Sequence, residues 1–197
     1  MTQGILGKFI TFVFIIGVFL CSTGCSHHIT NGITSRIIPE DIYNSDHKVQ
    51  PKDLSTDSKC STPPSIRIVN TDSRTEDFKC FEIRSNSYFI KPYEIMESAA
   101  SYLRAGYYKS GIKANDNSSK IIEMKLTDIE YLSAVWSHGS KVRIEVSIPE
   151  AKLYKIYEAR DYSQNLFTSI AESIHRITIQ IIDDQAIQNY ILCRMNE

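Results

Sequence analysis

The side chains that could do chemistry in this 197-residue chain are scattered and form no familiar catalytic motif. The sequence contains no glycine-rich phosphate loop, no Gly-x-Ser-x-Gly nucleophile turn and no His-Glu-x-x-His zinc motif. His138 and His175 have no partner at metal-ligand spacing, and two adjacent histidines, His27-His28, in a polar stretch are usually incidental. Asp183-Asp184 could be paired acids, but adjacent carboxylates at a helix boundary are typical of caps. We therefore expect a protein that is not an enzyme, with no metal and no cofactor.

Trp136 and His138 are the side chains that most suggest binding. They lie in Trp136–Ser140, a stretch whose composition predicts a turn between two strands. An exposed tryptophan is enriched at binding hot spots, so the pair is a candidate contact for a partner. The alternative is that Trp136 folds back onto the edge of the sheet.

The N-terminal segment indicates where the protein resides. Phe9–Leu20 is a mostly apolar run of about a dozen residues, which is short of the roughly 20 that span a bilayer. Small residues then lead to Cys25, and the whole resembles a bacterial lipoprotein signal peptide, although Ser22 stands where that pattern usually has leucine. The resemblance implies cleavage before Cys25 and lipidation (palmitate) of that cysteine. An uncleaved anchor helix or an ordinary secretory cut remains the alternative.

Lipidation of Cys25 would attach the protein firmly, because two or more acyl chains anchor stably where one does not. Ser26 follows the cysteine, whereas aspartate there retains such lipoproteins in the inner membrane. The resemblance therefore implies an outer-membrane lipoprotein that faces the periplasm, with the membrane as its first partner.

The chain divides into three parts by composition. Residues 1–24 form the signal peptide, and residues 25–64 form the lipidated cysteine and a polar, proline-punctuated tether. If flexible, about 39 tether residues have a root-mean-square reach of roughly 31–37 Å. A short apolar patch, Ile37-Ile38 with Ile42-Tyr43, interrupts the tether and could dock. Residues 65–197 form a single periplasmic domain.

The periodicity of the domain predicts an α+β fold with the order β-β-α-β-β-β-α. Residues 65–70 and 78–83 are expected as strands, and residues 92–109 as a helix that begins at a proline. Three strands between residues 122 and 160 alternate apolar and polar side chains, which indicates an antiparallel meander. An apolar stripe from Leu166 to Ile181 predicts the second amphipathic helix, with His175 on its polar side. We expect a mostly antiparallel sheet covered on one face by both helices.

Three cysteines remain once Cys21 is discarded and Cys25 is lipidated. The periplasm is oxidising, so a disulfide can persist there. Cys80 and Cys193 are the candidate pair, which would staple the C-terminus to the sheet. A Cys60–Cys80 bond and three free thiols are the alternatives.

The charge balance argues against one class of partner. The sequence has 22 basic and 23 acidic residues, for a formal charge of -1. Phosphate binding needs concentrated positive charge, so no nucleic-acid partner is expected.

The domain also resembles the YajG family of bacterial lipoproteins. The likeness rests on Asp72-Ser-Arg74-Thr75 after the first strand, on the helix from Ile95 to Gly106, and on the ending Ile181–Ile191. It implies a fold and a location but no catalytic residue. Arg74 is expected to pair with Asp72 or to satisfy a buried carbonyl.

Together these patterns predict a lipid-anchored, non-catalytic binding or adaptor module of the cell envelope with an envelope protein as partner. The alternative is an auxiliary lipoprotein of an envelope lipid or solute transport machine, with an acyl chain held between helix and sheet. An envelope enzyme would need a deep pocket that brings His138 or His175 together with acids.

Overall fold

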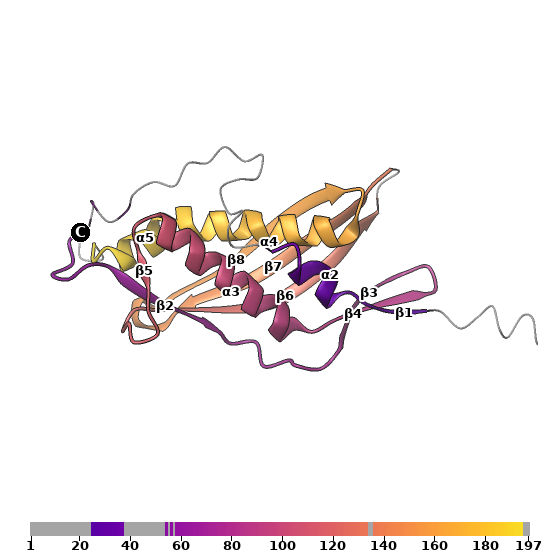
Figure 1. Ribbon diagram of the computed structural model, residues 1–197, viewed down its shortest axis with the longest axis horizontal. Coiled ribbons are helices and arrows are strands. Elements are labelled where there is room, and N and C mark those ends of the chain that lie inside the picture. Colours follow the sequence, from indigo (N-terminus) through magenta and orange to yellow (C-terminus); the bar gives the residue numbers. More distant parts are fainter. Residues whose placement is uncertain (1–24, 38–53, 55, 57, 134–135, 195–197) are drawn as a thin grey trace, which may run out of the picture.

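The long strands of the chain form one five-stranded sheet, with helices along one face (Figure 1). The computed structural model describes residues 25–37, 54, 56, 58–133 and 136–194, so the predicted signal peptide lies outside it. The sheet has the order β5-β2-β6-β7-β8. Its strands are β2 (Ser65–Asn70), β5 (Lys113–Ala114), β6 (Ile121–Ser133), β7 (His138–Ile148) and β8 (Leu153–Ser163).

The predicted meander is confirmed for β6, β7 and β8, which pair antiparallel in chain order. A 3₁₀ turn (Pro149–Ala151) joins β7 to β8, and Lys152 follows it in the left-handed region with φ of 50°. In β7 the even-numbered residues from Val142 to Ile148 are buried under the helices, and the odd-numbered ones face the other way. This alternation explains why the strand could be recognised from its sequence.

A second, smaller sheet has the order β1-β4-β3. β3 (Phe78–Ile83) and β4 (Asn86–Ile90) form an antiparallel hairpin, and β1 (Ser26–His28) pairs parallel to β4. The chain turns between the hairpin strands at Arg84, whose φ is 55°.

Helices α3 (Pro92–Lys109) and α4 (Leu166–Asp183) pack against each other and against the larger sheet. α3 begins at Pro92, as predicted, because a proline at the first helical position loses no backbone hydrogen bond. α4 begins after Asn165, whose Oδ1 accepts a hydrogen bond from Phe167 N–H at 2.8 Å. Asp184 ends α4 and caps the short helix α5 (Gln185–Ile191) by accepting from Ala186 N–H and Ile187 N–H, which confirms the predicted cap.

The α+β class is confirmed, but the topology differs from the prediction in strand order and in the number of elements, among which β1, α2 and β5 were not expected. β2 lies parallel to β6 instead of antiparallel to a neighbour, and β3 leaves the main sheet to pair with β4 and β1. The parallel pair has a physical reason, because α3 lies between β2 and β6 in sequence and supplies the crossover that parallel neighbours need.

The segment expected as a tether is folded where the structure describes it. β1 begins one residue after Cys25, and helix α2 (Thr30–Thr34) follows it directly. Ile29, Ile33 and Ile37 are all buried in the main core, so docking of the apolar patch is confirmed at Ile37. The rest of the patch, from Ile38 to Tyr43, lies outside the described residues. The prediction of a flexible tether from residue 25 is therefore wrong for residues 25–37, because three isoleucines at helical spacing give this short segment enough apolar area to dock.

None of the helices within the described ranges is long and apolar enough to cross a membrane.

Candidate partner-binding site

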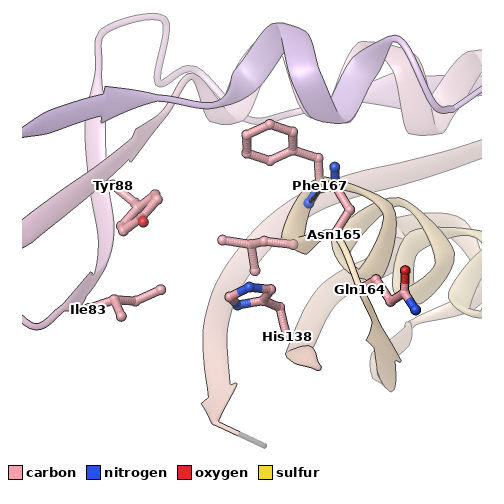
Figure 2. Close-up of a pocket in the computed structure, with 7 residues that line it drawn as sticks. Ile83, Tyr88, His138, Gln164, Asn165 and Phe167 are labelled. Atoms are coloured by element: carbon pink, nitrogen blue, oxygen red, sulfur yellow. Dashed lines mark hydrogen bonds between the residues drawn. The ribbon is translucent and has the colours of Figure 1, made fainter. Parts of the chain in front are cut away.

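A small pocket lies where the β3–β4 hairpin meets the start of β7 and the start of α4 (Figure 2). Its volume is about 230 Å³, which is below the 300–1,000 Å³ that is typical of small-molecule sites. Tyr88 and Ile83 form one wall, and His138 and Phe167 stand across from them. The remaining lining residues are Gln164, Asn165 and Leu166. A pocket of this size suits one inserted side chain better than a whole ligand.

Stacked rings connect the small sheet to the meander beside this pocket. The ring of Tyr88 lies between those of His27 and Phe81, with centroids 5.0 Å away on each side. Phe81 in turn stacks on Tyr131 at 5.9 Å, and Tyr131 is 6.0 Å from His138. Aromatic pairs at these distances stabilise the contact beyond simple burial of area. The row therefore fixes the hairpin wall against the sheet.

The opposite wall is held by α2, a part of the chain that the composition had suggested was a tether. A Cβ built on Gly32 would lie 2.7 Å from the Phe167 ring, so only glycine lets α2 approach this closely. Arg36 lies over the same ring, 5.6 Å from its centroid, and its Nε donates to Thr168 Oγ1 at 3.1 Å. The Phe167 side chain of α4 is thus held in place by Gly32 of α2 and by Arg36.

The structure places the two predicted contact residues at this end of the molecule. Trp136 lies in the β6–β7 turn and is 92% exposed, so it does not fold back onto the sheet edge. His138 is the first residue of β7 and is not part of a longer turn. Its Nδ1 lies 3.3 Å from Tyr131 Oη, and its ring lines the pocket.

Cys25, the predicted lipidation site, is exposed and immediately precedes β1. Its N–H donates to Asn86 Oδ1 at 3.2 Å, and its carbonyl accepts from Ser87 N–H at 3.0 Å. These bonds hold Cys25 beside the turn of the β3–β4 hairpin. Figure 1 shows that the start of β1, the turn of the β3–β4 hairpin, and the end of β6 with the start of β7 lie at one end of the molecule. The C-terminus lies at the other end.

The predicted Cys80–Cys193 disulfide is wrong. Cys193 is bonded to Cys60, with their Cα atoms 5.2 Å apart, and Cys80 is a free thiol. Cys80 lies on β3 in the small sheet, where its Sγ donates to the carbonyl of Tyr88 at 3.3 Å. Burial raises the pKa of this thiol to about 11, which makes it an inert packing residue.

Lys120 lies against the Cys60–Cys193 bridge. Its Nζ is 3.1 Å from Cys60 Sγ and 2.8 Å from Cys193 Sγ, and it also donates to the carbonyl of Ile191. Burial lowers the pKa of Lys120, and the charge of Glu150 partly opposes that shift. The bridge thus fastens the segment before β2 to the end of α5, next to the start of β6.

The Asp72–Arg74 turn that carries the family resemblance is an ordered ion pair. Arg74 Nε donates to Asp72 Oδ1 at 2.8 Å, and its Nη2 donates to Asp72 Oδ2 at 2.6 Å and to the carbonyl of Leu126. Both expected roles of Arg74 are therefore confirmed. Burial opposes ionisation of Asp72, but the hydrogen bonds and charge of Arg74 outweigh it and lower the pKa of that carboxyl.

A network of charged residues lies on the face of the larger sheet away from the helices. Arg143 donates to Asp128, Glu130 and Glu158 at 2.8–2.9 Å. Burial and the neighbouring Glu130 raise the pKa of Asp128, while a hydrogen bond from Lys141 lowers that of Glu130. Asp128 and Glu158 stand directly across from Arg143 on the neighbouring strands, and Glu130 stands across from Lys141. We interpret them as a ladder that stabilises the sheet.

The remaining histidines of the described segments pack against, or pair with, other side chains of the fold. His28 lies 3.2 Å from an oxygen of Asp77 and stacks on Phe89. His175 is buried and packs edge-on against Tyr102, with ring centroids 5.1 Å apart, so its predicted position on the solvent side of α4 is wrong. Within the described ranges, no group of three or more His, Cys, Asp or Glu side chains could hold a metal ion.

Comparisons with known proteins give little further information. No protein-family model matches the sequence, and neither does any curated protein. One similar solved structure is protein XCC0632 from Xanthomonas campestris, of the family DUF330. It shares 6% sequence identity and a TM-score of 0.43 over 68% of this chain and 87% of that one.

Sequence reasoning found His138 and Trp136 but missed the other walls of the pocket. Tyr88 and Ile83 could be assigned to extended segments, but their position across from β7 depends on the split into two sheets. Gly32, in a segment with isoleucines at positions 29, 33 and 37, was the available signal that α2 approaches another element closely.

Proposed function

We propose that this protein is a lipid-anchored lipoprotein of the bacterial cell envelope, of the YajG type, that acts as a non-catalytic adaptor. It is attached through Cys25 to the outer membrane and faces the periplasm. It binds an envelope protein at the end that carries Trp136 and the pocket beside His138. The observation that carries the proposal is Trp136, which is 92% exposed and lies two residues before His138, a lining residue of a mostly apolar pocket.

Both features are typical of interface hot spots. An aromatic anchor and a preformed pocket contribute more binding energy than a flat polar surface of equal area. The stacked row behind Tyr88 and the clamp on Phe167 hold the pocket open before a partner arrives, so little side-chain entropy is lost on binding. The expected partner inserts one apolar side chain between Tyr88 and Phe167 and covers Trp136.

The position of Cys25 supports attachment close to the membrane. Because β1 starts one residue after it, an acyl group on Cys25 would place the small sheet directly at the bilayer surface. The alternative, an acyl-chain carrier, has less support. Ile174, Ile177 and Ile181 of α4 are fully buried and fill the space between helix and sheet that a lipid would need.

The test is site-directed photocrosslinking in the native envelope. A photoreactive residue at Ser137, beside Trp136, should give a discrete adduct with one envelope protein. Gln164→Trp places a bulky ring at the rim of the pocket, and we expect it to reduce that adduct at least about tenfold, the equivalent of 1.4 kcal/mol. Lys125→Trp is the matched control, because Lys125 is exposed on β6 and does not line the pocket.

Two results would contradict the adaptor proposal. One is crosslinking to phospholipid alone, with no protein adduct. The other is an adduct that Gln164→Trp leaves unchanged. Attachment is tested separately: a Cys25→Ala chain that still fractionates with membranes and still incorporates labelled palmitate would contradict lipidation at Cys25.

A further inference from the structure

Strand β8 is an unusually complete template for pairing with another strand. It is the outermost strand of the larger sheet and has eleven residues, and no other described strand pairs with its outer edge. Its register with β7 runs from His138–Ser163 to Ile148–Leu153 without a shift, so no bulge twists it away. It contains no proline. Natural proteins usually protect such an edge with a bulge, a proline or a covering segment.

The uncovered face of β8 carries a cluster of exposed apolar side chains. Tyr154, Ile156 and Tyr162 are each more than half exposed, although isoleucine belongs to the residue types that are most often buried. Glu158 and Arg160 lie on the same face, between Ile156 and Tyr162. An exposed row of this kind is typical of a surface that another chain covers.

The other face of β8 is already occupied by α4 and the residues after it. Lys155 and Tyr157 both contact Asp184, at 2.6 and 2.7 Å. Arg176 donates to Asp161 at 2.9 Å. A partner strand is therefore free to use the outer edge and the uncovered face only.

We propose that β8 pairs antiparallel with β8 of a second copy of this chain, about a two-fold axis that passes Ala159 and is perpendicular to the sheet. The two five-stranded sheets become one continuous sheet, and the helices of both copies lie on the same face. This inference does not depend on the proposed adaptor function.

The sequence of β8 is complementary to itself in this register. With Ala159 opposite Ala159 of the second copy, Glu158 stands opposite the second copy's Arg160, and Ile156 stands opposite the second copy's Tyr162. The symmetry makes each pair occur twice. Opposite charges and apolar pairs that stand directly across two strands stabilise the pairing.

Neighbouring registers lack this match. An axis at Glu158 places that carboxylate against its own copy and sets Ile156 against Arg160. An axis at Arg160 places two guanidinium groups together and sets Glu158 against Tyr162. Like charges directly opposite each other destabilise a strand pair, so the side chains select the axis at Ala159. Self-complementarity of one patch is what a two-fold interface requires, and it favours a second copy over an unrelated partner.

Analytical ultracentrifugation of the full chain in detergent tests the association. The wild-type chain should sediment as a dimer, and Ile156→Lys should raise the dimer dissociation constant at least tenfold, because it buries an ammonium group against Tyr162. Ile156 is exposed, so the substitution should leave the circular dichroism spectrum unchanged. Tyr108→Lys is the control: Tyr108 is 76% exposed on α3, away from β8, and the variant should remain a dimer.

Cysteine crosslinking in the envelope tests the register. A mixture of Ile156→Cys and Tyr162→Cys chains places two exposed thiols directly opposite each other, with Cβ atoms about 4.5–5.5 Å apart, so an oxidant should link the copies. Ile156→Cys alone should not link, because its two copies lie six residues apart along the strands. The wild-type chain gives the background from Cys25 and Cys80.

A monomeric wild-type chain would overturn the proposal, and so would an Ile156→Lys variant that dimerises as well as wild type. Equal crosslinking of Ile156→Cys alone and of the mixed Ile156→Cys and Tyr162→Cys chains would overturn the register. A monomer whose β8 amides exchange slowly with solvent would show instead that a segment of the same chain covers this edge.

Discussion

Removing the Cys60–Cys193 bridge should destabilise the domain strongly. The bridged residues are 133 positions apart, so reduction frees a very long loop in the unfolded chain. The chain-entropy model gives about 5 kcal/mol at 25 °C for a loop of that length. This value is an upper expectation, because native bridges commonly contribute about 2–5 kcal/mol. We therefore expect the Cys60→Ser/Cys193→Ser variant to lose 2–5 kcal/mol of unfolding free energy.

Urea titration followed by circular dichroism measures this loss. With a slope of about 2 kcal/mol per molar urea, a 5 kcal/mol loss lowers the midpoint by about 2.5 M. Cys80→Ser is the matched control, since Cys80 is free and half-buried, and it should change the midpoint far less. A double variant that loses under 1 kcal/mol would refute the reasoning. A Cys80→Ser loss as large as that of the double variant would show that Cys80 is the bonded cysteine.

Two further measurements test other parts of the structure. Ile33→Ala should cost about 2–5 kcal/mol, because Ile33 is fully buried in the core; a cost below 1 kcal/mol would mean that α2 is not part of the cooperative fold. Asp72 should add acid sensitivity, because its folded-state pKa lies below its unfolded value of about 3.9. Its stabilisation is present above that value and is lost as the pH falls through the folded-state pKa, so Asp72→Asn should flatten the dependence of unfolding free energy on pH below about 5. An unchanged slope would contradict the ion pair with Arg74.

Periodicity predicted the helices and strands whose ends are marked by residues in the local sequence. The bounds of α3, β2 and β3 agree with those expected from sequence, since proline, glycine and alternation mark their ends. The meander was predictable because one face of each strand is exposed to solvent and the other is buried. In these cases the local sequence contains the physical cause of the structure.

Long-range contacts were not predictable in the same way. β1 has three residues and α2 has five, which is too few for either to be stable alone. They exist because Ile29 and Ile33 reach a core built by residues far along the chain. His175 was assigned to solvent because helix periodicity assumes one buried face, whereas α4 is covered by both the sheet and α3.

The candidate site was predictable only in part. Trp136 and His138 stood out by residue type and position. The pocket needs the β3–β4 hairpin to lie against the start of α4, and the disulfide needs the C-terminus to return to residue 60. Both are consequences of the arrangement of two sheets, which single-strand patterns do not encode.

The attachment of β1 directly after Cys25 has a mechanical consequence. β1 runs along the long axis of the molecule, and its first residue lies at the end from which the anchor would leave (Figure 1). Tension between the membrane and the domain would therefore act along the strand and load its backbone bonds to β4 together, as a shear, instead of opening them one at a time. Behind those bonds, Ile29 and Ile33 would have to leave the core before the chain could extend. If Cys25 is lipidated, as we propose, a domain fastened in this manner would follow the movements of its membrane without slack.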